Sequence, residues 1–404
     1  MTRIEKRNTK YINLLLILLS SRVFMEFLNV LLNGVLKLSS TSFLTIGIYS
    51  ILFVIFFFYY VLNQSSSFKD LIWILAIYIF YLISFSFSKV KENFFGVGMV
   101  LLYLFYIPIS FGIVANISSW NEYEKITKKY VAIDLIAALF TMVLSFKFGS
   151  SDSTTYMTVT YAILPILCSS FLILKTKMDI PLLLLSLANL VLMVLYGARM
   201  GLFLAIIMLV LCFFQKVGKV GKFFLTLLLV CVIFFCSGLL QNASIIKQLT
   251  SFASDKNIHI LNQLLKGELF SSSGREEIYE EMRYQINNMG SNVYGLFGDR
   301  LFTTSYAHNI FYETILSFGW FGGIFFLFLL LVLSTIGFHS AIKQKRGMLF
   351  ICFFLSFFCK FFVSSSFAID YSFFIYVAIA LSFAKSNKKA QFSISNYENF
   401  VCHC

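Results

Sequence analysis

Apolar stretches of about twenty residues recur along most of this chain, and short polar connections separate them. A helix needs about twenty apolar residues to cross a lipid bilayer. About twelve stretches meet this length, near residues 11–31, 43–62, 71–88, 94–117, 130–148, 155–174, 180–196, 199–214, 222–240, 308–336, 347–363 and 367–384. The pattern predicts an all-α polytopic membrane protein with about twelve transmembrane helices.

One long polar segment, residues 241–307, interrupts the apolar pattern. It ends at His308-Asn309, where the next apolar stretch begins. The predicted organisation is spans 1–9 in residues 1–240, one large loop with helices of its own in 241–307, spans 10–12 in 308–384, and a short tail in 385–404. A membrane protein with one such loop, and a histidine where it re-enters the bilayer, is expected to do chemistry at the membrane surface.

Composition agrees with a membrane protein, because 59% of the residues are hydrophobic and only 13% are charged. Soluble domains carry about a quarter charged residues. The first span contains Arg22 and Glu26 and lacks a small-residue cleavage site, so no removable signal peptide is expected. Cys402-His403-Cys404 has no second cluster to complete a metal site, and we expect neither a metal nor a cofactor.

Lysines and arginines concentrate in connections that alternate along the chain. These connections hold Arg3, Lys6, Arg7 and Lys10; Lys69; Lys125, Lys128 and Lys129; Lys175 and Lys177; Lys216, Lys219 and Lys222; Lys343, Lys345 and Arg346; and Lys385, Lys388 and Lys389. The opposite short connections hold only Lys37, Lys89, Lys91 and Arg199. The positive-inside rule therefore predicts a multi-pass protein of the cytoplasmic membrane, with both termini cytoplasmic and the 241–307 loop external or periplasmic.

The formal net charge of +13 follows from these topology signals beside anionic lipid headgroups. The basic residues are not interleaved with aromatic residues as on a nucleic-acid surface, so no nucleic-acid partner is expected.

Arg199 lies in a short turn that glycines flank, Tyr196-Gly197-Ala198-Arg199-Met200-Gly201. Two helices of about 16 residues on either side rise only about 24 Å each, against a hydrocarbon core of about 30 Å. The turn is therefore expected below the external surface, where an arginine is costly unless an anion or a wet cavity meets it. The alternative is an interfacial arginine that extends to the headgroups.

Arg275 lies in the first turn of a predicted loop helix. Ser273 and Glu276 fit a capping box, and Ile278, Met282 and Ile286 recur at helical spacing. Unpaired amides at a helix start favour an anion, and a guanidinium matches phosphate oxygens. A surface arginine paired with the neighbouring glutamates is the alternative.

His308 opens the sequence His308-Asn309-Ile310-Phe311-Tyr312-Glu313, which leads into a glycine-rich apolar span. A neutral imidazole near pH 7 can accept a proton from a sugar hydroxyl. Taken alone, a histidine at a helix start is more often structural.

These features, in this order, resemble the family of O-antigen polymerases and O-antigen ligases, with which the capsule repeat-unit polymerases belong. The matched stretches are Tyr196–Gly201, Ser273–Asn288 with the glycines of Tyr294–Gly298, and His308–Gly323. The resemblance places the two functional arginines of the family on Arg199 and Arg275 and its essential histidine on His308. One departure is Tyr279, where many members carry tryptophan.

The resemblance implies a metal-independent membrane glycosyltransferase that polymerises oligosaccharide repeat units linked to undecaprenyl pyrophosphate. Arg199 and Arg275 would bind the donor pyrophosphate, whose negative charge grows as it leaves, and His308 would deprotonate or orient the acceptor hydroxyl. Further candidates for acceptor binding or positioning are Asn309, Tyr312, Glu313 and Arg300.

The expected partners are the lipid-linked donor and acceptor glycans, membrane lipids, and chain-length regulator and flippase proteins. A ligase of the same family, which transfers the glycan to a separate lipid or protein, is an alternative that the sequence leaves open. A lipid-linked oligosaccharide flippase is a second alternative of another class, and a non-enzymatic receptor is a third.

Overall fold

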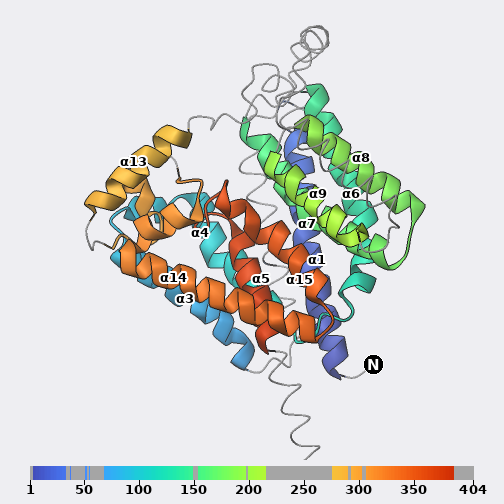
Figure 1. The fold of residues 1–404 in the computed structure, drawn as a ribbon, viewed down its shortest axis with the longest axis horizontal. Helices are drawn as coiled ribbons and strands as arrows, with labels where there is room; N and C mark the ends of the chain where they lie inside the picture. The colour runs from blue at the N-terminus through green and yellow to red at the C-terminus, as the bar shows by residue number, and fades with distance from the viewer. Residues whose placement is uncertain are drawn as a thin grey trace, which may run out of the picture. The chain divides into compact units, whose positions relative to one another are not determined.

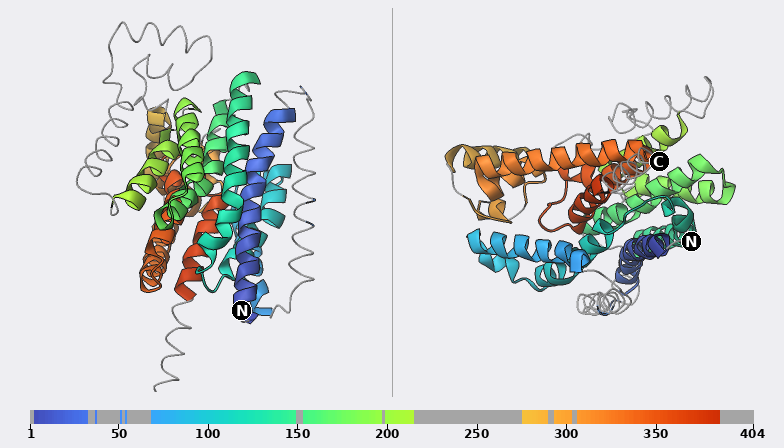
Figure 2. Two further views of the ribbon diagram at one scale, coloured as in Figure 1. Left: turned by 90° about the vertical axis from the view of Figure 1, so that its right-hand side faces the viewer. Right: turned by 90° about the horizontal axis from the view of Figure 1, so that it is seen from below.

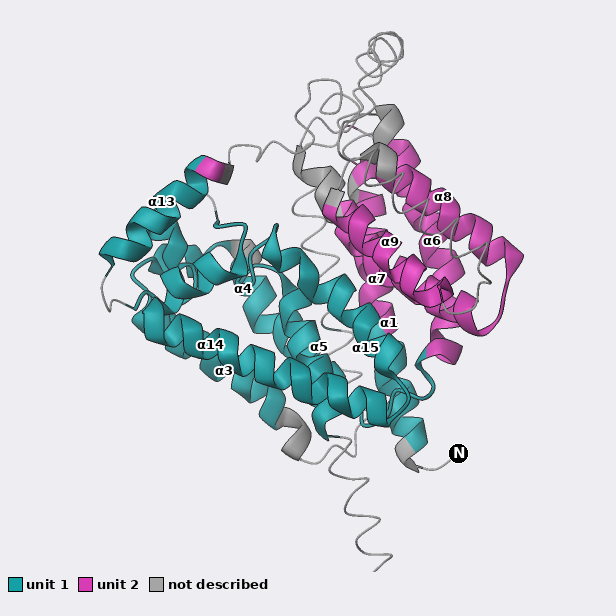
Figure 3. Ribbon diagram, viewed as in Figure 1, with its two compact units in different colours: residues 1–15, 46–123, 277–404 teal, residues 16–45, 124–276 magenta. Residues whose placement is uncertain are grey.

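The computed structural model of this chain describes residues 3–32, 68–148, 153–196, 199–214, 275–289, 293–302 and 306–385, together with the single positions 37, 51 and 54. Within these ranges the regular structure is helical, and no strand occurs there. The chain divides into two compact units, shown in Figure 3. Unit 1 comprises Met1–Leu15, Ile46–Tyr123 and Glu277–Cys404, and unit 2 comprises Leu16–Thr45 and Glu124–Glu276.

Ten of the twelve predicted spans coincide with described helices, most of which are labelled in Figure 1. They are α1 (Arg3–Val30), α3 (Phe68–Phe87), the run α4 (Val97–Leu101), η3 (Leu102–Tyr106) and α5 (Ile107–Ala115), α6 (Tyr123–Phe148), α7 (Ser153–Thr176), α8 (Ile180–Tyr196), α9 (Arg199–Phe213), α14 (Ile310–Lys343), the run α15 (Gly347–Phe353), η5 (Phe354–Phe358) and η6 (Cys359–Phe362), and the helix Tyr371–Lys385. The spans predicted at 43–62 and 222–240, most of the polar loop, and the tail lie outside the described residues.

Three described helices are long and apolar enough to cross a membrane, at Glu5–Leu28, Val159–Thr176 and Ile310–Lys343. The other apolar helices are shorter. The chain therefore has the helical, apolar character of a membrane-embedded protein, and the number of twelve crossings stays a prediction.

In unit 2, the helices α7, α8 and α9 pack against one another, as Figures 1 and 2 show. The contact between α7 and α9 is close at Gly201, where an added Cβ would lie 2.5 Å from Cγ2 of Thr160. Ser170 and Ser186 share a hydrogen bond of 2.8 Å between α7 and α8. Small and polar residues of this kind let apolar helices approach without a hydrophobic driving force.

In unit 1, α3 packs against α5, and α14 packs against α15. Aromatic rings fill much of its interior. Trp120 stacks on Phe383 with ring centroids 5.4 Å apart, and its indole N–H donates to Ser382 at 2.9 Å. The buried polar end of this large side chain is therefore satisfied.

Helix α14 is broken near its start. Gly319 has φ 73° and ψ 174°, values that do not fit a helix and that favour glycine. An unbroken helix of 34 residues would rise about 51 Å, well beyond a hydrocarbon core of about 30 Å. The break leaves a short segment, Ile310–Phe318, which we call the half-helix, followed by Trp320–Lys343, which rises about 36 Å.

The half-helix lies close to the longer segment that follows it. A Cβ added at Gly323 would lie 2.7 Å from Cα of Ile315 and 2.8 Å from the carbonyl oxygen of Thr314. The half-helix also contains several buried residues, whereas Trp320–Lys343 exposes many large apolar side chains. The predicted span of 308–336 therefore corresponds to a helix that extends to Lys343 and whose backbone departs from helical geometry at Gly319.

Gly323→Ala should lower the thermal stability of the purified protein in detergent, because the new methyl group meets backbone atoms that cannot rotate away. Overpacking of this kind typically costs about 1–3 kcal/mol. Gly96→Ala is the matched control, since a Cβ at Gly96 meets nothing within 4 Å. An equal melting temperature for both variants would contradict the close packing of the half-helix.

Candidate functional site

The two predicted arginines both occupy the first residue of a helix. Arg199 begins α9 and Arg275 begins α13 (Arg275–Asn288). Both arginines belong to unit 2. The helix predicted from the Ser273 capping box is therefore confirmed from Arg275 onward, whereas Ser273 itself and the side chains of both arginines lie outside the described part of the chain. A shared role of Arg199 and Arg275 stays a prediction.

The connection before Arg199 is as short as predicted, since α8 ends at Tyr196 and α9 begins at Arg199. Helix α8 has 17 residues and α9 has 15. These helices rise about 26 Å and about 23 Å, less than the full hydrocarbon core. The expectation that Gly201 belongs to the turn is wrong, because Gly201 lies inside α9 and its missing side chain makes room for Thr160. Gly197 lies outside the described residues.

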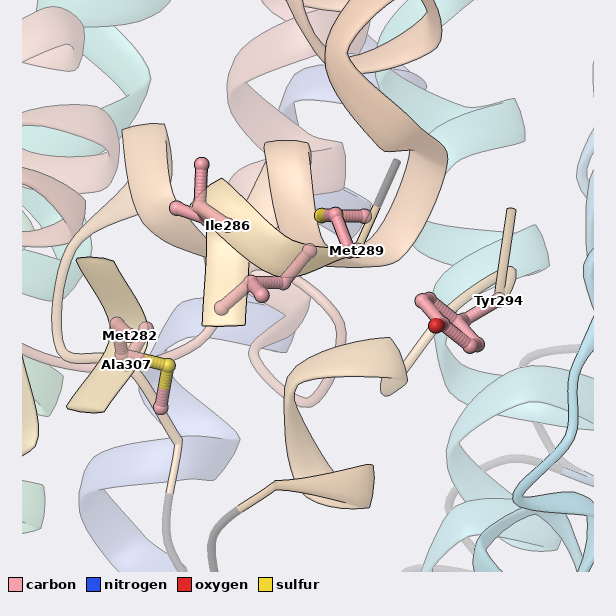
Figure 4. Packing of buried hydrophobic residues seen from close by; sticks show 6 residues of the cluster. Met282, Ile286, Met289, Tyr294 and Ala307 are labelled. Atoms are coloured by element: carbon pink, nitrogen blue, oxygen red, sulfur yellow. The ribbon is translucent and has the colours of Figure 1, made fainter. Parts of the chain in front are cut away.

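Helix α13 is joined to the His308 segment by one hydrophobic cluster, shown in Figure 4. Its buried members are Met282, Ile286, Met289, Tyr294, Ala307 and Leu316. In addition, the rings of Tyr279 on α13 and Tyr312 on the half-helix lie 5.3 Å apart. The polar-loop helix that begins at Arg275 and the residue directly before His308 therefore share a core.

The segment from Tyr294 to Gly298 is fixed by close backbone contacts. Gly295 has φ 70°, and a Cβ there would lie 2.4 Å from the carbonyl oxygen of Ser84 at the end of α3. A Cβ at Gly298 would lie 2.5 Å from the carbonyl oxygen of Leu316, and the Tyr294 amide donates to the Ser317 carbonyl at 3.1 Å. These two glycines therefore pack the segment tightly between α3 and the half-helix.

His308 is held between two anchored neighbours. Before it, the Ala307 amide donates to Oδ2 of Asp299 at 3.0 Å. After it, Asn309 caps α14, because its side-chain oxygen accepts from the Phe311 amide at 2.9 Å. His308 itself is half-buried with φ 53°, and its ring lies 4.1 Å from that of Tyr306. The left-handed conformation, uncommon for histidine, is the kind of local strain found at functional sites.

Asp299 lies in η4 (Gly298–Leu301), is only 1% exposed, and has an altered acidity. Burial raises its pKa to about 6, while the Ala307 amide and the Arg300 guanidinium oppose the shift by favouring the carboxylate. The Arg300 guanidinium also lies 5.4 Å from the centre of the Phe297 ring. Arg300, predicted to position the acceptor, is thus a half-buried neighbour of the Asp299 carboxyl.

Glu313 is predicted to bind or position the acceptor, but it is only 1% exposed. Its Oε1 accepts a hydrogen bond from the Ser366 hydroxyl, and its Oε2 accepts from the Phe367 amide at 3.2 Å. In the structure this carboxylate therefore ties the half-helix to the segment Ser366–Ala368. Tyr312, the residue before it, is half-buried in the contact with Tyr279.

Two further buried interactions hold the chain beside Glu313, and neither was predicted from the sequence. Lys360 forms an ion pair with Asp370 and donates to Ser372 at 3.0 Å. Tyr103, in the π-helical segment η3, donates its hydroxyl to the Ala368 carbonyl. A lone lysine inside the predicted span 347–363 was the available signal, since ionisable residues in apolar spans are costly unless they are paired.

Among the described residues, no group of three or more His, Cys, Asp or Glu side chains could hold a metal ion. The described part of the chain places the His308 imidazole next to Ala307, whose amide the buried Asp299 carboxyl holds. It also joins the His308 segment to α13, the helix that Arg275 begins. No protein-family model, curated protein or solved structure matches this chain.

Asp299→Asn should stabilise the protein at neutral pH, because it removes a buried charge and keeps an oxygen for the Ala307 amide. The pKa of Asp299 is raised in the folded state, so its carboxyl favours folding below about pH 4, and this contribution is lost as pH rises through about 6. The melting temperature of the variant should therefore exceed that of the wild type at pH 7.5 and converge with it near pH 4.

The control for this titration is Glu281→Gln, since Glu281 is an exposed carboxylate on α13. A pH-independent difference between Asp299→Asn and the wild type would show that Asp299 is not the group that titrates.

Proposed function

We propose that this protein is a membrane glycosyltransferase that transfers a glycan from a lipid-pyrophosphate donor to a hydroxyl acceptor at the external face of the cytoplasmic membrane. The observation that supports it most is the contact of Tyr279 with Tyr312, within the cluster that joins α13 to the His308 segment. Arg275 begins α13 one turn before Tyr279, and His308 lies four residues before Tyr312. This contact joins the helix that Arg275 begins to the half-helix that follows His308.

Arg275 suits the donor pyrophosphate for two physical reasons. The start of a helix presents unpaired amides and the positive end of the helix dipole, which favour a negative charge. A guanidinium adds donors with the geometry of phosphate oxygens. We extend the same role to Arg199, which also begins a helix, so that two cations neutralise the leaving group without a metal.

His308 suits the acceptor side of the reaction. A neutral imidazole can take the proton of a sugar hydroxyl as that oxygen attacks the anomeric carbon of the donor. The C–O bond to the new glycan forms while the bond to pyrophosphate breaks, and the leaving group departs on its lipid. The anchors at Ala307 and Asn309 limit how far the imidazole moves during this step.

The resemblance in sequence to O-antigen polymerases and ligases favours undecaprenyl-pyrophosphate-linked oligosaccharides as donors. With a second lipid-linked glycan as the acceptor, the product is a surface polysaccharide such as a capsule or an O-antigen. With a different lipid or protein acceptor, the same site would act as a ligase. Both reactions use the donor site and the histidine alike, and they differ only in the second substrate.

Arg275→Ala should abolish glycan elongation by the purified protein, given lipid-pyrophosphate repeat units and a chelator. Arg275→Lys should recover only part of the activity, because a point charge does not reproduce a bidentate phosphate contact. Arg283→Ala is the matched control, since Arg283 lies two turns later on α13, and its exposed side chain donates to the Tyr279 carbonyl at 3.2 Å. Equal activity for Arg275→Ala and Arg283→Ala would remove Arg275 from the donor site.

His308→Ala should lower the transfer rate by about 10²–10⁴-fold, the usual contribution of a general base, and leave donor binding unchanged. His339→Ala, on the same helix α14, serves as the control. A loss of only about twofold would argue for a structural histidine.

The same elongation assay separates the candidate functions. Transport of lipid-linked glycan across vesicles without elongation would support a flippase. Loss of elongation in EDTA, restored by Mg²⁺, would contradict a mechanism based on arginines.

A further inference from the structure

Glu313 meets an unusual arrangement of hydrogen-bond donors. The Ser366 hydroxyl and the Phe367 amide approach its two carboxylate oxygens. The Ser366 hydroxyl oxygen also accepts from the Ala368 amide at 3.2 Å. Both oxygens of the Glu313 side chain are therefore bonded to one short segment, Ser366–Ala368.

An apolar side chain at position 313 would break both of these bonds. A buried donor left without an acceptor costs more than a normal hydrogen bond contributes. Since Glu313 is 1% exposed, water does not replace the lost acceptor.

The same residue is connected to His308 through the backbone. The Glu313 amide donates to the Asn309 carbonyl at 3.0 Å, which forms the first turn of the half-helix, and Asn309 directly follows His308. On the other side of the contact, Ser366–Ala368 is held by the Tyr103 hydroxyl at the Ala368 carbonyl. The Ser365 hydroxyl donates to Asp370 at 2.8 Å, within the ion pair with Lys360. The segment Ser366–Ala368, which Glu313 contacts, is therefore itself held in place by other hydrogen bonds.

We propose that Glu313 is a positioning residue for the transfer reaction, clamping the half-helix that follows His308 onto the segment Ser366–Ala368. This inference rests on the proposed function. In this role the Glu313 side chain does not contact the substrate. It determines the position of the first turn of α14 and, with it, the position of the His308 imidazole. A displacement of about 1 Å in a reacting group can reduce a rate by about 100-fold.

Glu313→Leu removes both bonds and should therefore lower kcat by at least about tenfold and leave KM for both lipid-linked substrates unchanged. Hydrogen exchange in the peptide 364–370 should become faster in the same variant, because the Phe367 amide loses its acceptor. Glu281→Leu makes the same chemical change at an exposed position of α13 and should alter neither measurement.

The double variant Glu313→Leu with Ser366→Ala provides the sharper test. Ser366→Ala removes the hydroxyl that bonds Glu313, so the two residues act through one contact. The loss of kcat that Ser366→Ala causes in the wild type should therefore shrink in the Glu313→Leu background. Residues that contribute independently to global stability would give additive losses.

The outcomes separate this inference from the proposed function. If the wild-type protein elongates glycans and Glu313→Leu keeps its kcat and its slow exchange, the clamp is wrong. If the wild type elongates nothing, the proposed function fails, and the exchange experiment still decides whether the clamp exists. If Glu313→Leu does not fold, Ser366→Ala alone should lower kcat and protection by a smaller factor, and an unchanged kcat there would also overturn the proposal.

Discussion

The break in α14 at Gly319 is the constraint on which the candidate site depends. A left-handed φ at this residue ends the half-helix after one short run and allows the rest of α14 to proceed as a long apolar helix. Without the break, Glu313 and Leu316 would continue on the face of one straight helix, and the half-helix would lie far from Gly323. A single glycine conformation thus separates the part of the chain suited to lipid from the part that holds polar side chains.

Several polar groups around the half-helix are paired inside a largely apolar unit. Asp299 accepts from Ala307, Glu313 accepts from the Ser366 segment, and Lys360 pairs with Asp370. In a low-dielectric interior such groups are costly alone and strong when they are complete. Their concentration on both sides of His308 makes this region more specifically ordered than hydrophobic packing alone would require.

Hydropathy and helix length anticipated much of the architecture. The bounds of α8 and the start of α9 follow from the apolar runs on either side of Gly197, and α13 begins within its predicted capping motif. The break at Gly319 was not foreseen, because a glycine in an apolar run is also tolerated within a regular helix. The bond of Glu313 to Ser366 joins residues 53 positions apart, and no local pattern encodes such a contact.

In the run α15, η5 and η6, the number of residues matters as much as their chemical type, because the segment η5 is π-helical. A π-helical turn accommodates one residue more than an α-helical turn, and one residue turns a helix by about 100°. Phe354–Phe358 therefore sets the angular register of everything that follows, including Lys360. Deleting one residue from this segment would restore a more regular helix and at the same time rotate the lysine away from Asp370, toward apolar surroundings that offer its charge no partner.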